Sequence, residues 1–162
     1  MNNKVLHQTF ATLSFLLAAI VYTMTVQPSV PFWDCGEFSA AATWQQVPHP
    51  PGAPLFLMIG KLFQVIIPFG DLGWRVNLAA VFSSAFTVLF TYLIAVRMIK
   101  SYKGEPNNLG DAIAMFGSGF IAAAALTFSD TMWFNSVESE VYATSLTFVA
   151  LIVWLMMKWY DK

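Results

Sequence analysis

Two acidic residues, Asp34 and Glu37, stand three positions apart in an aromatic-rich segment, residues 31–38. This spacing places two side chains on the same face of a helix. Apolar surroundings raise the pKa of a carboxyl group unless a cation offsets the effect. A general base that works near neutral pH is built in this way. The pair is therefore the first candidate for catalysis.

The same pair also fits a structural role at the start of a helix. Asp34 would be the N-cap residue and Glu37 the third helical residue, which is the arrangement of a capping box. An interfacial helix over residues 35–46 would follow. The two roles are compatible, because a capping residue can also do chemistry, and the pattern leaves both open.

His49 begins a stiff corner that follows this helix. Three prolines within five residues end the preceding helix, and these are Pro50, Pro51 and Pro54. Gly52 permits a turn, and Pro54 suits the first turn of the next helix. His49 either lines a pocket or hydrogen-bonds to nearby backbone. Together with Asp34 and Glu37 it makes no clear ligand set for a metal ion, so neither a metal nor another cofactor is predicted.

Arg75 lies at the outer end of a long apolar segment, two residues before Asn77. Its guanidinium group either extends to the membrane interface or binds a phosphate group, which its planar fork suits. Both roles remain open.

A second acidic group, Glu138 and Glu140, precedes the last apolar segment. Asn135 and Glu138 resemble a capping box, and Glu140 would lie near a helix N-terminus, where the helix dipole favours an anion. Alternatively, Glu138 or Glu140 faces the first outer loop, residues 27–73, and completes an acidic pocket, because acids at the membrane boundary are functional candidates.

The elements that position these residues are helices in a membrane. The chain is 57% hydrophobic and 10% charged, whereas soluble domains have about a quarter charged residues. Four segments approach the roughly 20 apolar residues that a bilayer span needs: 8–26, 74–98, 110–129 and 141–158. Residues 53–68 are apolar but short and contain Lys61, which favours a re-entrant or juxtamembrane helix over a full span. Gly117, Gly119 and the alanines at 122–125 predict close helix packing.

These elements predict an all-α polytopic membrane protein with one transmembrane domain. It has four spans, and a long outer loop, residues 27–73, holds two short juxtamembrane helices. The first span exceeds the roughly 7–15 residues of a signal-peptide core, so an uncleaved anchor is favoured over a signal peptide.

The basic residues predict the orientation. With a cytoplasmic N-terminus and four spans, six of the eight basic residues lie on the cytoplasmic side, as the positive-inside rule prefers: Lys4, Arg97, Lys100, Lys103, Lys158 and Lys162. The candidate acids then face outward. Separately, we expect the membrane to be a bacterial inner membrane. The absence of a basic patch argues against nucleic acid as a partner, and the single cysteine, Cys35, excludes a disulfide within the chain.

The motifs of residues 23–142, taken in order, resemble a known family. They are Trp-Asp-x-x-Glu-Phe (33–38), His-Pro-Pro-Gly (49–52), Gly-x-x-x-x-Arg-x-Asn (70–77) and Asn-Ser-Val-Glu-Ser-Glu-Val-Tyr (135–142). This order is similar to the N-terminal part of the protein O-mannosyltransferase family once called domain of unknown function 2723, the transmembrane protein 260 type. That family belongs to the GT-C class of multi-span glycosyltransferases.

The resemblance implies a glycosyltransferase with an inverting mechanism. Its donor would be a sugar, mannose for this family, on a polyprenyl phosphate, and its acceptor a protein or glycan hydroxyl group on the non-cytoplasmic face. Asp34 matches the essential acid of the first outer loop, which acts as general base, and Glu37 is its companion. Arg75 would meet the donor phosphate, and three residues would line the pocket: His49, Glu138 and Glu140.

The members of that family are several times longer than this chain. The chain is therefore expected to be a fragment or a truncated relative, and residues 1–162 alone are not expected to transfer sugar. The competing hypothesis is a non-catalytic membrane module, part of a transporter or an assembly subunit, whose acids only cap helices. A transporter places polar residues near the middle of the membrane, whereas the acids here cluster at its outer boundary.

Overall fold

The computed structural model describes residues 2–50 and 52–160, and these residues form helices without any strand. In chain order the helices are α1 (Asn3–Thr25), α2 (Cys35–Trp44), α3 (Pro54–Ile66), α4 (Leu72–Lys103), α5 (Leu109–Thr127), α6 (Asp130–Ser136) and α7 (Val141–Tyr160). The all-α prediction is confirmed.

Four helices, α1, α4, α5 and α7, are long and apolar enough to cross a membrane. They correspond to the four predicted spans, and α4 is longer than predicted at both ends. At 1.5 Å per residue its 32 residues extend about 48 Å, so it projects beyond a hydrocarbon core of about 30 Å. Helix α3 has 13 residues and reaches only about 20 Å. It is therefore a short helix, as predicted, and too short to span.

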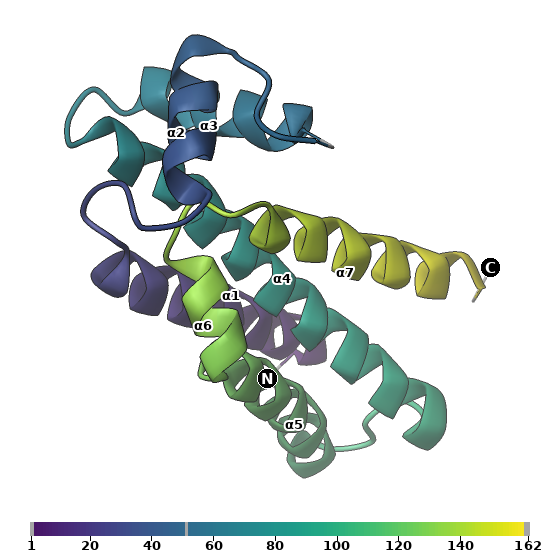
Figure 1. The fold of residues 1–162 in the computed structure, drawn as a ribbon. Helices are drawn as coiled ribbons and strands as arrows, with labels where there is room; N and C mark the ends of the chain where they lie inside the picture. The colour runs from purple at the N-terminus through teal and green to yellow at the C-terminus, as the bar shows by residue number, and fades with distance from the viewer. Residues whose placement is uncertain (1, 51, 161–162) are drawn as a thin grey trace.

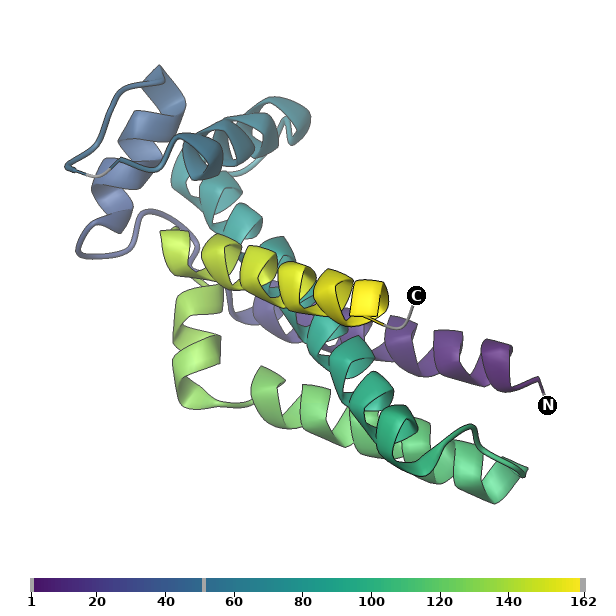
Figure 2. The same cartoon turned by 90° about the vertical axis from the view of Figure 1, so that its right-hand side faces the viewer.

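The four long helices run in alternating directions, and the short helices gather at one of their ends (Figures 1 and 2). We call the long helices the body. Residues 27–71, with α2 and α3, and residues 129–140, with α6, form the cap. The opposite end of the body holds both termini and the α4–α5 connection (Figure 2). Five basic residues lie in the helix turns at that end, namely Lys4, Arg97, Lys100, Lys103 and Lys158; Lys162 lies outside the described residues.

The body is packed closely around α4. A Cβ atom at Gly119 of α5 would lie 2.6 Å from the Cγ2 atom of Val96 and 3.2 Å from the ring of Tyr92, both on α4. Only glycine permits this approach, which confirms the close packing expected there. Tyr22 of α1 is fully buried in the same core and donates a hydrogen bond of 2.9 Å to the Thr127 carbonyl oxygen.

The cap is joined to the body by polar contacts to backbone groups. Asp71 caps α4 by accepting from the Gly73 amide at 2.8 Å. The two short helices are joined at Thr43 of α2. Its carbonyl oxygen accepts from the Lys61 ammonium group at 2.7 Å, and its hydroxyl group accepts from the Gln64 amide at 2.8 Å. The Gln64 amide also donates to the Leu72 carbonyl oxygen at 3.3 Å, and this contact ties α3 to the first turn of α4.

The segment before the last span differs from the prediction. It contains the helix α6, and the expected capping box of Asn135 and Glu138 is wrong. Asn135 lies inside α6 and donates to the Thr131 carbonyl oxygen at 2.8 Å, and α7 begins only at Val141. The side chains of Glu138 and Glu140 are thereby placed in the linker between two helices.

Candidate functional site

Asp34 lies at the start of α2, in the N-cap position, but its side chain makes no capping hydrogen bond. The predicted capping box is therefore absent. The preceding residue, Trp33, has φ 63°, a left-handed conformation that is unusual for a bulky residue. Such strain clusters at functional sites. Trp33 stands two residues before the first residue of α2, and the carboxylate of Asp34 beside it is exposed.

The carboxylate of Glu37 binds His49 through both of its oxygens. Oε1 accepts from the His49 backbone amide at 2.6 Å, and Oε2 lies 2.6 Å from the ring Nδ1. This bonding lowers the pKa of Glu37 and raises the pKa of His49. Helix α2 is thereby tied to the proline corner, of which Pro51 lies outside the described residues. The two alternatives left open for His49 are in part both true, since it is hydrogen-bonded locally and also lines a cleft.

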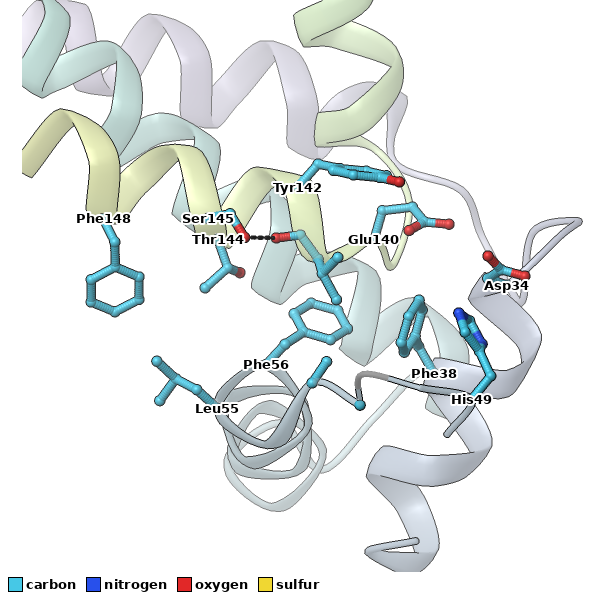
Figure 3. Close-up of a pocket in the computed structure, with 13 residues that line it drawn as sticks. Asp34, Phe38, His49, Leu55, Phe56, Glu140, Tyr142, Thr144, Ser145 and Phe148 are labelled. Atoms are coloured by element: carbon cyan, nitrogen blue, oxygen red, sulfur yellow. Dashed lines mark hydrogen bonds between the residues drawn. The ribbon is translucent and has the colours of Figure 1, made fainter. Parts of the chain in front are cut away.

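A cleft of about 450 Å³ opens between α2, α3 and the first turns of α7 (Figure 3). Its polar end is formed by Asp34, His49 and Glu140, and its apolar end by Leu55 and Phe148, as Figure 3 shows. The remaining lining residues are mostly apolar or small: Phe38, Gly52, Ala53, Phe56, Val141, Tyr142, Thr144 and Ser145. The cleft is therefore amphipathic along its length.

Glu140 reaches the cleft because the α6–α7 linker is bonded to α2. The Cys35 thiol, which is buried, donates to Glu140 Oε1 at 3.5 Å. Ser139 donates to the Cys35 carbonyl oxygen at 3.3 Å, and its hydroxyl group lies 3.2 Å from that of Ser39. These contacts bring together segments that are about 100 residues apart in the chain.

Burial changes the acid–base properties of this linker. It raises the pKa of Glu140, and the charge of Asp34 raises it further. Burial and the charge of Glu140 likewise raise the pKa of Glu138. Glu138 is 9% exposed and does not line the cleft. The structure therefore places one of the two predicted acids in the cleft and the other behind it.

Arg75 does not line the cleft either. Its Nε, Nη1 and Nη2 groups donate to the carbonyl oxygens of Phe69, Gln64 and Gly70, each at 3.0 Å. Neither extension to the membrane interface nor phosphate binding, the two roles that the sequence left open for Arg75, includes this bonding to backbone carbonyl oxygens. The guanidinium group ties the end of α3 and the loop after it to the start of α4.

One group of possible metal ligands occurs among residues 2–50 and 52–160. Asp34, Glu37 and His49 each offer a ligand atom, and these atoms lie within 4.8 Å of one another. Both Glu37 oxygens are engaged by His49, so Glu37 and His49 already satisfy part of each other's hydrogen bonding. Exposed acids often gather in this way without an ion.

Several cleft residues were not predicted from the sequence. Val141, Thr144, Ser145 and Phe148 line it at the spacing of one helix face. That spacing is present in the sequence. It could be assigned to the cleft-facing side of α7 only when the structure showed that the helix begins at Val141. The hydrogen bond between Cys35 and Glu140 could not be predicted from either residue's neighbours in the sequence.

Comparison with known proteins gives one family. The model of the family described as "Protein O-mannosyl-transferase TMEM260 N-terminal domain" matches residues 34–162. The chain is 30% identical over 152 residues to "Protein O-mannosyl-transferase tmem260" of Dictyostelium discoideum, covering 93% of the chain and 17% of that protein. It is 31% identical over 144 residues to "Protein O-mannosyl-transferase TMEM260" of Mus musculus, covering 89% of the chain and 18% of that protein.

These comparisons limit what can be transferred. The chain spans less than a fifth of the length of these relatives. Both relatives are eukaryotic, so they give no support to the expected bacterial inner membrane. No solved structure matches the chain.

Proposed function

Because the chain belongs to the TMEM260-type protein O-mannosyl-transferase family, we propose that it forms part of the active site of a membrane glycosyltransferase. The donor is a sugar, mannose, on a polyprenyl phosphate, and the acceptor is a hydroxyl group of a protein Ser or Thr. The observation that supports this most is the amphipathic cleft with Asp34 at its polar end.

The shape of the cleft suits a lipid-borne donor. Its apolar end lies beside Phe148 of the membrane helix α7 and Leu55 of α3, where an isoprenoid chain buries apolar surface. Its polar end, at the cap, accommodates the phosphate and the sugar. A donor held in this way has its reacting carbon at the boundary between lipid and water, where a soluble acceptor can approach.

Asp34 is the proposed general base. Its carboxylate removes the proton of the acceptor hydroxyl group while the hydroxyl oxygen attacks the anomeric carbon. The bond from that carbon to the phosphate oxygen breaks, and polyprenyl phosphate leaves with the electron pair. Attack opposite the leaving group inverts the anomeric centre. A general base contributes about 10²–10⁴-fold to a rate.

The proposed orientation places the cap outside the cytoplasm. Basic residues favour the cytoplasmic side, and five of them lie at the end of the body opposite the cap. The N-terminus is then cytoplasmic, and the acceptor is a protein on the lumenal or extracellular side. A purely capping role for Asp34 and Glu138 is less favoured, because neither expected capping box is formed.

The test is the Asp34→Asn variant of the intact protein, assayed with a polyprenyl-phosphate mannose donor and an acceptor peptide. Removal of the base should lower the transfer rate by about 10²-fold or more with unchanged expression. Asp130→Asn is the matched control, because Asp130 is an exposed acid in the same cap and does not line the cleft. Full transfer activity of Asp34→Asn would exclude Asp34 as the base.

A further inference from the structure

The cleft has an unusual charge balance for a site that binds a phosphate. Within the part of the chain that the structure describes, the residues that line the cleft include the acids Asp34 and Glu140 but neither lysine nor arginine. Glu37 adds a third carboxylate, one helical turn from Asp34. A phosphodiester would enter a negative field unless a cation in the cleft offsets it.

Two basic side chains, Lys61 of the cap and Arg75 at the start of α4, are engaged away from the cleft. The Lys61 ammonium group donates to the Thr43 carbonyl oxygen, and the Arg75 guanidinium group donates to three carbonyl oxygens around the end of α3. Neither residue lines the cleft. Among the described lining residues, His49 is the one side chain that can become a cation at physiological pH.

We propose that His49 is the group of the cleft that binds the donor phosphate, and that Glu37 is a positioning residue that holds His49 for this task rather than a catalytic acid. This inference rests on the proposed function, because it assumes a phosphate-bearing donor. It assigns the recognition of the anion to the Glu37–His49 pair and leaves the base role to Asp34.

The geometry supports this division of roles. Glu37 engages the backbone amide and Nδ1 of His49, so Nε2 is the ring nitrogen left to donate to a ligand. The Phe38 ring lies 5.8 Å from the imidazole, centroid to centroid, and limits its rotation. Figure 3 shows the imidazole beside Phe38, facing the same space as Asp34. A fixed donor at the polar end of a lipid-shaped cleft is suited to a phosphate oxygen.

The surrounding charges favour the protonated imidazole. The hydrogen bond to Glu37 raises the pKa of His49 most, and the charges of Glu37, Asp34 and Glu140 raise it further. The pKa of a free histidine is about 6.5. The imidazolium form therefore persists to a higher pH than in a free histidine, and phosphate affinity is present below the raised pKa and is lost as the pH rises through it.

The experiment measures binding of methyl citronellyl phosphate to the intact protein in a neutral detergent. This short isoprenoid phosphodiester has one negative charge that does not change over the tested pH range. Citronellol, which has the same apolar chain without charge, is the ligand control. Affinity for the phosphodiester should fall roughly three- to tenfold between about pH 5.5 and about pH 8.5, as expected for an exposed, charge-assisted bond. Affinity for citronellol should stay constant.

The variants separate the two roles. His49→Gln should weaken binding of the phosphodiester at about pH 5.5 to the level that the native protein shows at about pH 8.5, with citronellol unaffected. Glu37→Gln should move the midpoint of the pH dependence downward, because the carboxylate charge is lost, and His49→Arg should restore affinity without pH dependence. Asp130→Asn is the protein control and should behave like the native protein.

The outcomes distinguish this inference from the proposed function. Phosphodiester binding that is independent of pH and unchanged in His49→Gln overturns the role of His49 and leaves the lipid-phosphate donor in place. A requirement for a divalent ion, revealed by loss of binding in EDTA, overturns it in favour of a metal at Asp34, Glu37 and His49. A native protein that binds neither ligand overturns both proposals.

Discussion

The body and the cap are held together by different interactions. In the body, glycine and other small residues let helices approach closely, and the contacts are mainly apolar, as at Gly119. In the cap, backbone carbonyl oxygens accept from long polar side chains, from Lys61 within the cap and from Arg75 at the start of α4. A membrane supplies little hydrophobic force between helices, so shape must hold the body. The cap positions reacting groups, and directional hydrogen bonds suit that task.

The largest effect is expected where the body is tightest. In Gly119→Leu the new side chain overlaps Val96 and Tyr92, because a Cβ atom alone would come within 2.6 Å of Val96. Overpacking costs about 1–3 kcal/mol or more in the free energy of unfolding. Loss of monodisperse protein in size-exclusion chromatography, and unfolding at lower SDS concentration, would measure it.

Gly117→Leu is the matched control for this substitution. Gly117 lies two residues away on α5, and a Cβ atom there would meet nothing within 4 Å. It should leave the stability of the protein nearly unchanged. Equal destabilisation by both substitutions would show that glycine matters in α5 for backbone reasons and not for packing against α4.

A smaller effect is expected in the cap. Arg75→Gln removes a guanidinium fork that binds three carbonyl oxygens. Each such bond contributes about 0.5–1.5 kcal/mol, and less where it is exposed to water. Because these bonds hold the end of α3, we expect faster amide hydrogen exchange in α3 and in residues 67–71, with the body unchanged. Lys103→Gln, which removes an exposed positive charge at the other end of α4, should not have this effect.

A third test addresses the bridge between the two segments of the cap. Ser39→Ala and Ser139→Ala each remove one partner of a buried hydroxyl pair at 3.2 Å, and each should cost about 1 kcal/mol in stability. In a double-mutant cycle the two changes should couple by about 0.5–1 kcal/mol, since the residues contact each other. A coupling energy near zero would mean that the hydroxyl pair does not join α2 to the linker.

The sequence predicted the body better than the cap, and the physical reason is the range of the interactions. A transmembrane span depends on local sequence, because a run of about 20 apolar residues is sufficient to form one. The start of α3 could also be predicted from a local signal, since the helix begins at Pro54. Arg75 shows the limit of prediction from sequence. Its three carbonyl partners lie at the end of α3 and in the loop after it, and their position relative to α4 is known only from the structure. Local patterns likewise suggested a capping box at Asn135, whereas the chain formed a further helix, α6.

Cys35 shows the same limit in the candidate site. Its position beside Asp34 was plain, but its bond to Glu140 joins residues 105 positions apart. Glu37 and His49 are closer in the chain, and both were named as candidates. Their direct bond, however, depends on where α2 ends, at Trp44, and on the left-handed conformation of its C-cap residue, Gln45. Glutamine is not a residue type that predicts such a C-cap.

The smallest effect is expected on the reactivity of Cys35, which tests whether the cap is packed as tightly as the body. Cys35 is 1% exposed, and burial, with the charges of Glu138 and Glu140, raises the pKa of its thiol to about 12. The thiolate is the reactive form, so alkylation of Cys35 by N-ethylmaleimide in native protein should be slow at about pH 8 and should accelerate only at strongly alkaline pH. Glu140→Gln should increase the rate only modestly, because burial is the larger cause and remains. Rapid alkylation of the native thiol near neutral pH, mapped to Cys35 by mass spectrometry, would show that α2 separates from the α6–α7 linker. The cap would then be a mobile element, and the shared position of Asp34, His49 and Glu140 only one of its states.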